Sequence, residues 1–516
     1  LESVTLHTLT IDGAVSWTQQ DKLLDLPLVA DLRHAGFRSD MSADGRTLVV
    51  AAEVAGSSSG VVLVYSWNGS GWSEVTRLYA PDRDRAGQGF GQALSISPAG
   101  DRLIVGAPDD STIAERCGAA YIFEDISPTS PYGSTWQFRE KVVNPDLRVF
   151  SGGGTGAAFG QAVSITNDYA AVGATGEGAD TVSIFQRQPA TGKWASLTIA
   201  RSSLMSNVDA GWYGAYDRAS GFGTAVAIAQ SGQDFTLVVG APLYEPAVVG
   251  GGIGEDDNRG RAEVFQYDAG GVFARTAFLT ASEQQPGEQF GRSIDLVDGR
   301  IVVGAPLWDD PRDGDADQGR AFVFEANAAS PGFWPAFPGW DRIARLTADG
   351  GLTEAQALNV GKAGEQFGAA VAIAGDQVVV GAPQAEAGGV TQGGVAYVFY
   401  RLADQGSGTG ASWTRSAGVA FDSLGNGTEV FHLQAVNPAG ASTDLTGPYA
   451  TADRFASSVA VGGGRVVAGI PGLNETFTQD GQTAVSRADV GGVRTFATNG
   501  ILPIGTEPAD TAGWWA

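Results

Sequence analysis

One repeated unit limits what this chain can fold into. It reads Phe-Gly, a short alternating apolar segment, a polar turn, Val-Val-Gly-Ala-Pro, a variable loop and Gly-x-Ala-x-Val-Phe. Period-two alternation and short β-branched runs are typical of strands, and self-similarity along a chain is typical of repeat architectures. The Phe-Gly pairs begin at Phe90, Phe159, Phe222, Phe290 and Phe367, with degenerate copies at Phe37 and Phe455.

The other parts of the unit recur in step with the Phe-Gly pairs. Gly-Ala-Pro occurs at Gly106, Gly240, Gly304 and Gly381, with weaker copies at Ala51, Gly173 and Gly469. A Trp or Phe that heads a fourth strand occurs at Trp17, Trp72, Trp136, Trp194, Phe273, Trp340 and Trp413. Because Trp17 precedes the first unit and the last unit has no copy, an N-terminal strand within 15–24 is expected to pair with the strand near Val493–Phe496.

These counts predict an all-β fold, a seven-bladed β-propeller of four-stranded antiparallel blades. The propeller should occupy residues 1–500, with the ring closed by the N-terminal strand. An insertion or long hairpin is expected at about 404–454. A tail follows at 501–516, and its Trp514-Trp515 pair should dock on a blade or a neighbour, since exposed tryptophans are a liability.

The composition excludes several classes of function. The 516 residues hold 57 acidic and 32 basic side chains, a net charge of −25, which disfavours nucleic acids and anionic membranes. Divalent cations or basic partners suit such a surface. Cys117 is the only cysteine, so no intramolecular disulfide can form. No apolar run is long enough for a membrane span, so direct membrane insertion is not expected.

The repeat resembles the FG-GAP repeat of integrin α-chain propellers, and more closely the bacterial branch of that family. The resemblance covers about residues 15–497. It implies an extracellular or cell-surface protein that mediates adhesion or protein recognition. Integrin-type blades often carry a calcium loop between their first two strands. Here those turns are short, as at Ser97–Asp101 and Asp298-Gly299, and the family's calcium sites are not carried over.

Acidic residues gather instead in the second-to-third and fourth-to-first connections, which emerge on one face of a propeller. The sharpest group is a candidate calcium site, because alternating carboxylates can converge on a hard cation. It comprises Asp309, Asp310, Asp313, Asp315 and Asp317. A second, weaker acidic site comprises Glu255, Asp256 and Asp257. No other cofactor is expected.

Catalytic signatures are missing from the sequence. His7, His34 and His432 show no metal-ligand spacing, and no nucleophile elbow occurs. No catalytic residue is therefore assigned, and the chain is predicted not to be an enzyme. Three sequons begin at Asn68, Asn426 and Asn474 and are candidate glycosylation sites.

The expected function is thus a protein-interaction, adhesion or assembly module that binds a protein partner or a neighbouring subunit. It could serve as a subunit of a surface fibre or layer. A propeller lectin that binds glycans is the alternative. An enzyme with a polar cluster in the central channel is the third hypothesis. A glycan array would separate the first two.

Overall fold

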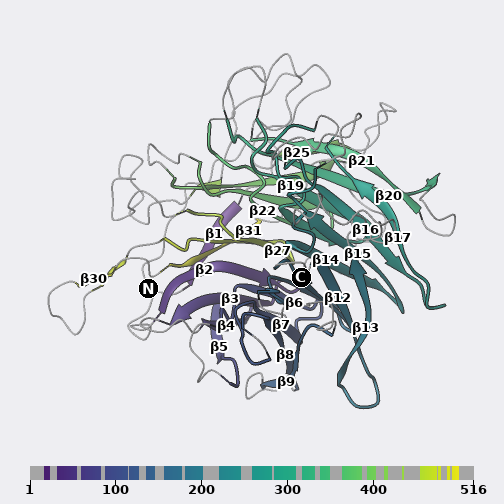
Figure 1. Cartoon of the computed structure of the whole chain (residues 1–516). Helices are drawn as coiled ribbons and strands as arrows, with labels where there is room; N and C mark the ends of the chain where they lie inside the picture. The colour runs from purple at the N-terminus through teal and green to yellow at the C-terminus, as the bar shows by residue number, and fades with distance from the viewer. Residues whose placement is uncertain are drawn as a thin grey trace.

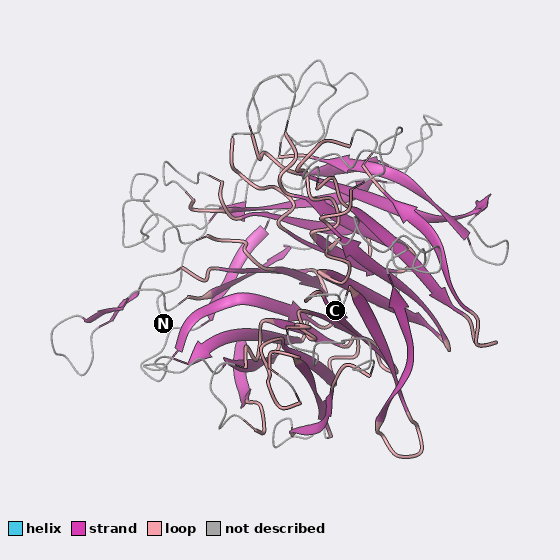
Figure 2. Cartoon of the chain, in the orientation of Figure 1, coloured by secondary structure: helices cyan, strands magenta, loops and turns pink. Residues whose placement is uncertain are grey.

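The computed structural model describes residues 17–23, 32–54, 60–82, 88–113, 115–126, 135–145, 156–176, 180–201, 220–245, 258–281, 284–309, 316–331, 338–348, 363–385, 392–402, 412–415, 433–434, 454–472, 475–477, 485–487 and 491–498. Every regular element among these residues is a β-strand (Figure 2). Accordingly, the described residues include no helix with the length and apolarity needed to cross a membrane.

The strands form seven antiparallel sheets, each a propeller blade (Figure 1). Blade 1 contains β2 (Leu32–Met41), β3 (Thr47–Val54), β4 (Gly60–Trp67) and β5 (Trp72–Leu78). Blade 2 contains β6 (Ala93–Ile96), β7 (Arg102–Ala107), β8 (Ala119–Asp125) and β9 (Trp136–Val142). Blade 3 contains β10 (Ala162–Ile165), β11 (Tyr169–Ala174), β12 (Thr181–Arg187) and β13 (Trp194–Arg201). Blade 4 contains β14 (Ala225–Ser231), β15 (Asp234–Ala241), β16 (Arg261–Tyr267) and β17 (Phe273–Leu279).

The remaining blades follow the same order. Blade 5 contains β18 (Ser293–Val297), β19 (Arg300–Ala305), β20 (Arg320–Pro331) and β21 (Pro338–Leu346). Blade 6 contains β22 (Ala370–Ala374), β23 (Gln377–Ala382), β24 (Val395–Leu402) and β25 (Ser412–Arg415), with the short β26 (Leu433–Gln434) also paired to β24. Blade 7 contains β27 (Val459–Gly462), β28 (Arg465–Gly469), β31 (Val493–Thr498) and β1 (Trp17–Leu23). A hairpin of β29 (Glu475–Phe477) and β30 (Val485–Arg487) lies between β28 and β31.

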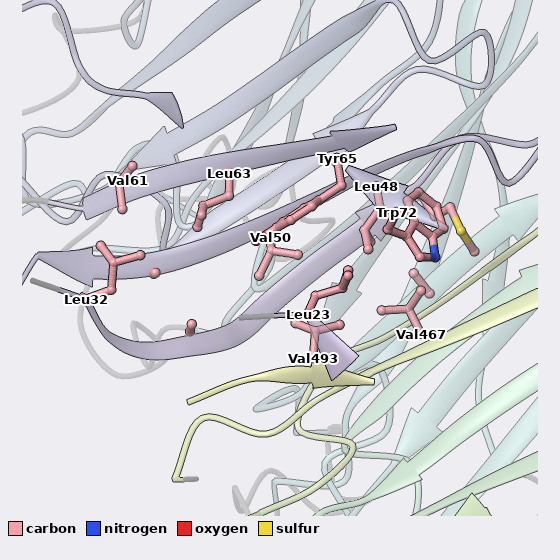
Figure 3. Packing of buried hydrophobic residues seen from close by; sticks show 14 residues of the cluster. Leu23, Leu32, Leu48, Val50, Val61, Leu63, Tyr65, Trp72, Val467 and Val493 are labelled. Atoms are coloured by element: carbon pink, nitrogen blue, oxygen red, sulfur yellow. The ribbon is translucent and has the colours of Figure 1, made fainter. Parts of the chain in front are cut away.

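The first strands of the blades form the inside of the ring. Each contacts the first strand of the next blade, in the order β2, β6, β10, β14, β18, β22, β27 and back to β2. In blade 7, β1 pairs with β31 from Trp17 opposite Thr498 to Leu23 opposite Val493. Leu23 and Val467 pack with Leu48 and Val50 of blade 1 in one buried cluster (Figure 3). The seam between blades 7 and 1 is therefore packed like the others.

The Phe-Gly motif makes the contact between neighbouring blades. Phe290 is fully buried and meets Phe324 edge-on, with ring centroids 6.2 Å apart. Gly291 has φ +93°, and a Cβ there would lie 2.5 Å from the carbonyl oxygen of Arg261. Only glycine tolerates both the backbone conformation and this approach. The motif thus combines a large buried plate with a close backbone crossing.

In blade 1 the motif is not Phe37-Arg38, and that sequence assignment was wrong. Ala35 makes the parallel bridge to Gly491 that Phe290 makes to Gly260, and Gly36 has φ +85°. His34 (φ 51°) matches Gln289 (φ 54°) just before the motif. Ala35-Gly36 therefore occupies the motif position: blade 1 keeps the glycine and has a smaller side chain before it, whereas blade 7 keeps Phe455 and has Ala456 (φ 64°) in place of the glycine.

The fourth strand of blade 6 is divided into two pieces. β25 pairs with Phe399–Leu402, and β26 pairs with Val395 and Ala396 on the same edge of β24. In blades 1 to 5 the fourth strand instead has a register shift at the corresponding place, as between Val323 and Phe324 of blade 5. The insertion therefore enters where the other blades have a bulge. Most of 404–454, and the tail at 501–516 with its tryptophan pair, lie outside the described residues.

Candidate functional site

The inner strands bring seven equivalent side chains to the axis of the ring. We call the place five residues after the motif aromatic, or after Ala35, the axial position. Each axial residue pairs with the residue that lies two positions before the first residue of the Gly-Ala-Pro motif or of its weaker copy. Examples are Ser95 with Ile104 and Asp295 with Val302. The seven axial residues are Asp40, Ser95, Ser164, Ala227, Asp295, Ala372 and Ala460.

Axial side chains bridge one inner strand to the next. Asp40 accepts hydrogen bonds from the amides of Met41 (2.8 Å) and Ile96 (2.9 Å). Asp295 does the same for Leu296 and Ile373, both at 2.8 Å. The serines accept one amide each, from Ile165 to Ser95 (3.4 Å) and from Ile228 to Ser164 (3.1 Å). These bonds satisfy amides on the free inner edges of the sheets.

Both aspartates follow a blade whose axial residue is alanine, although blade 7, which follows Ala372, has Ala460 at this position. Blades 1 and 5 follow the blades whose axial residues are Ala460 and Ala227, which offer no acceptor to the next strand. In these two blades the axial aspartate bonds to the amide of its own strand as well as to that of the next. A serine suffices where the preceding blade already supplies an oxygen. The aspartates are thus structural bridges, in addition to any role in binding.

Both axial carboxylates titrate near neutral pH. Burial raises the pKa of Asp40 to about 7; the amide of Ile96 opposes the rise and the negative charge of Asp295 adds to it. Burial raises the pKa of Asp295 to about 6 against its two backbone amides. In a seven-membered ring, blades 1 and 5 stand across the axis from one another. The two carboxylates therefore form a pair of like charges at the centre of the ring.

A second polar group lies on the same two strands, nearer the ends where the blades begin. Arg38 precedes Asp40 by two residues in β2, and Arg292 precedes Asp295 by three and lies just before β18. Both side chains are exposed. The sequence analysis missed all four residues. Their signal is an alignment of the repeats by the Gly-Ala-Pro motif, which places charged side chains where other blades have Ala, Ser, Thr or Gln.

The connections between blades emerge at one end of the ring, which we call the loop face. At the opposite end, which we call the turn face, the first-to-second connections are short turns, such as 298–299 and 375–376, and the third-to-fourth connections range up to ten residues, as at 126–135. On the loop face Lys141 donates to Asp82 (2.7 Å) and Asp110 (2.8 Å). The Tyr121 hydroxyl donates to the same two carboxylates at 2.8 and 2.9 Å. This network joins the connection between blades 1 and 2 to the second-to-third loop of blade 2.

Glu288 is the most unusual acid of the loop face. Its side chain is fully buried, and neither carboxylate oxygen reaches hydrogen-bond geometry with a described group. Burial raises the pKa of Glu288 to about 8, while the Gln285 amide and the charges of Arg320 and Arg259 lower it. Arg320 lies over the ring of Trp308. The raised pKa therefore favours the protonated form of Glu288 at neutral pH.

Substitution of Glu288 by glutamine should remove a pH-dependent loss of stability. The folded pKa, about 8, exceeds the ordinary value of 4.5, so the wild type is most stable below that value and loses stability as pH rises through 8. Asp40 contributes a similar loss only up to about pH 7. Urea unfolding at pH 7 and pH 9 should show a smaller decrease for Glu288→Gln than for wild type. Equal decreases in stability for Glu288→Gln and wild type would contradict this prediction and indicate that water solvates the ionised Glu288 carboxylate.

The predicted calcium loop is described only at its two ends. Asp309 accepts the amide of Asp317 at 2.7 Å, and burial, then the charge of Asp309, raises the pKa of Asp317. Asp310, Asp313 and Asp315 lie outside the described residues, as do Glu255, Asp256 and Asp257 of the second site. Among the described residues, no three acidic, histidine or cysteine side chains gather to hold a metal. Calcium binding stays a prediction.

The other residues selected from the sequence have ordinary surroundings where they are described. Asn68 is exposed in the turn after β4, and its side-chain oxygen accepts the amides of Ser70 (2.9 Å) and Gly71 (3.0 Å). Its glycosylation stays a prediction. Asn426 and Asn474 lie outside the described residues. His34 contacts Glu53 at 2.9 Å, and Cys117 is buried.

The arrangement of seven four-stranded sheets around an axis makes this protein a β-propeller. The family model described as "FG-GAP repeat" matches residues 72–123, 273–324 and 357–399. The chain is an FG-GAP repeat β-propeller. The first two matches run from the head of a fourth strand to the end of the third strand of the next blade.

Solved structures share the fold at low identity. The β-propeller domain of Cps50 (Swd1) from Myceliophteria thermophila is 10% identical with a TM-score of 0.45, over 93% of this chain and 99% of that chain. Periplasmic gluconolactonase PpgL from Pseudomonas aeruginosa is 14% identical with a TM-score of 0.40, over 74% and 86%. Hydrazine synthase from Kuenenia stuttgartiensis is 13% identical with a TM-score of 0.38, over 73% and 80%. No curated protein sequence is significantly similar to the chain.

The prediction that the chain is not an enzyme was wrong, because an enzyme role is possible. Similar solved propellers bear the titles gluconolactonase, putative 6-phosphogluconolactonase and hydrazine synthase. The prediction rested on missing linear motifs. In a propeller, groups from different blades meet at the axis or on a face without forming any motif in the sequence. These likenesses show the fold alone and assign no activity to this chain.

Proposed function

We propose that this propeller is an extracellular or cell-surface recognition module that binds a protein partner or a neighbouring subunit on its loop face. The observation that supports it most is the difference between the two faces. Second-to-third connections as long as 242–260 and 306–319 begin and end at the loop face, whereas the first-to-second connections of the turn face are as short as 298–299. Variable loops held on a rigid scaffold are a common way to build a binding surface.

Hydrogen bonds at the base of the loops support a preformed surface. The glycine that begins the third strand donates its amide to the loop in blades 2, 4, 5 and 6, from Gly118, Gly260, Gly319 and Gly394. The acceptors are the carbonyls of Asp110, Tyr244, Trp308 and Ala385. The side chains of these four positions differ while the backbone contact stays the same. The face can therefore change its chemistry from blade to blade without losing its shape.

The charge of the chain favours a basic partner. The net charge is −25, and the loop face carries exposed acids such as Glu115. Opposite charges speed association and orient the encounter, and added salt weakens both effects. A basic protein surface is the partner that this face would attract.

Binding to arrays of purified extracellular proteins and of glycans tests the proposal. Glu115→Lys reverses a charge on the loop face. Asp376→Lys does the same on the turn face, where the Asp376 side chain is 62% exposed. We expect wild type to bind at least one array protein, with added NaCl and Glu115→Lys each slowing association several-fold and Asp376→Lys having little effect. Equal effects of the two variants, or no protein bound, would refute the proposal. Binding to glycans alone would favour the lectin alternative.

A further inference from the structure

Two arginines occupy the axis end of the loop face without an acidic partner among the residues that the structure describes. Arg38 donates through Nε to the carbonyl of Gln92 (3.1 Å) and through Nη1 to that of Phe37 (2.9 Å). These two carbonyls fix the guanidinium and leave further N–H groups of Arg38 unused. Arg292 makes no side-chain hydrogen bond or ion pair with the described residues.

Many other arginines of this acidic chain do have acidic partners. Elsewhere in the described residues arginines meet carboxylates, as in Arg77–Glu74, Arg187–Glu124, Arg275–Glu263, Arg300–Glu325 and Arg401–Glu325. In the described part of the chain, Arg38 is linked to an acid only indirectly: it bonds to the carbonyl of Gln92, whose side chain donates to Asp109 at 3.4 Å. Asp109 is already paired with Arg116 at 2.8 Å.

The neighbouring positions of the other blades add no negative charge. At the level of Arg292, the residues are Phe37, Gln92, Gln161, Thr224, Ala369 and Ser457. At the level of Arg38, they are Ala93, Ala162, Ala225, Ser293, Ala370 and Ser458. The axial carboxylates lie further along the strands and accept backbone amides. The residues at these two levels are thus uncharged, and all of them except Phe37 are small or polar.

The two guanidinium groups also sense each other. They belong to blades 1 and 5, which face one another across the axis. Burial first, and then the positive charge of Arg292, lowers the pKa of Arg38. The Arg38 side chain is exposed to water and yet surrounded by protein. Two like charges held together without a counterion destabilise the folded state, and an anion between them would relieve the repulsion.

We propose that Arg38 and Arg292 form a binding site for an oxyanion group at the axis of the ring. Guanidinium groups bind phosphate, sulfate and carboxylate oxygens with charge-assisted, often bidentate hydrogen bonds. Phosphate groups and small dicarboxylates carry oxygens of this kind. This inference does not rest on the proposed function, because the partner on the loop face is basic and the ligand of the axis is anionic.

Calorimetric titration and thermal unfolding test the site. The probes are inorganic phosphate and malonate, each titrated at constant ionic strength against a sodium chloride reference. The test variant is Arg38→Gln with Arg292→Gln; glutamine occurs at the level of Arg292 in blades 2 and 3, as Gln92 and Gln161. The control is Arg77→Gln, which removes an arginine paired with Glu74 in outer strand β5 of blade 1.

We expect saturable binding to wild type and to Arg77→Gln, and affinity about tenfold or more weaker in the double variant. Without anion, the double variant should melt no lower than wild type, since a repulsion has been removed. With anion, only wild type and the control should gain stability. Preference for phosphate or malonate identifies the source of the oxyanion. Absence of saturable binding to wild type, or equal affinity in the double variant, would overturn the proposal.

Discussion

Phe290→Ala is expected to lower the free energy of unfolding by about 3–5 kcal/mol. The Phe290 ring is fully buried and packs on Phe322 and Phe324, with centroids 5.4 and 6.2 Å away. Removing it takes away the burial of a large side chain and leaves a cavity between blades 4 and 5. The rigid backbone crossing at Gly291 prevents the blades from closing onto that cavity. Urea unfolding followed by tryptophan fluorescence measures the change.

Phe278→Ala is the matched control for this substitution. Phe278 lies in the outer strand β17 of blade 4 and is 37% exposed. Its truncation should cost clearly less, because the site is open to water and leaves no closed cavity. If the two variants unfold at the same urea concentration, the motif phenylalanine does not hold the blades together. Ala35 shows that one blade already functions with a small residue at this position.

Lys141→Met should cost a similar amount, about 3–5 kcal/mol, because it removes one partner of a buried ion pair. Lys141 is the cation between Asp82 and Asp110, and the Asp110 side chain is only 1% exposed. Burial alone would raise the pKa of Asp110, but the hydrogen bond from Lys141 holds it below its ordinary value. Methionine preserves the length of the side chain and removes the charge. The buried carboxylate then lacks its counterion.

The pH dependence separates this electrostatic effect from a packing defect. In wild type the lowered pKa makes the Asp110 contribution complete above the ordinary value of 3.8 and lost as pH falls below it. In Lys141→Met, protonation of Asp110 should relieve the defect, so the difference between variant and wild type should shrink from pH 7 to pH 4. Lys193→Met, at an exposed turn position, is the control. A difference that is constant with pH would point to packing.

Much of the fold could be predicted because the same pattern of residues recurs in each blade and forms the same strands. The runs before Gly-Ala-Pro form buried second strands, and Trp72, Trp136 and Trp194 begin fourth strands. The error at Phe37 shows the limit of this reasoning. The sequence analysis followed the aromatic ring, whereas the structure keeps the glycine with positive φ, Gly36, at the same place. In blade 1 the glycine of the motif is retained, whereas the aromatic residue before it is replaced by Ala35.

The candidate sites were less accessible from the sequence. Arg38 and Arg292 are separated by most of four blades in the sequence, and nothing in a linear motif links them. Their relation appears only when the blades are superposed and the ring is closed. The acids of 309–317 were visible as a sequence pattern, but spacing alone cannot show which carboxylates converge. The two that are described, Asp309 and Asp317, meet through a backbone amide of the loop.

The hydrogen bonds between inner strands determine which blades could be duplicated without the loss of an acceptor. A second copy of blade 3 inserted after the first would find Ser164 beside the amide of its own Ile165, so every edge amide would keep an acceptor. A second copy of blade 4 would present Ile228 to Ala227, and that amide would lose the oxygen that Ser164 now supplies. Duplication of blade 3 would therefore preserve these bonds, whereas duplication of blade 4 would lose one, as blade 7 already does after Ala372. The axial residues therefore affect which duplications of a blade preserve the hydrogen bonds of the ring.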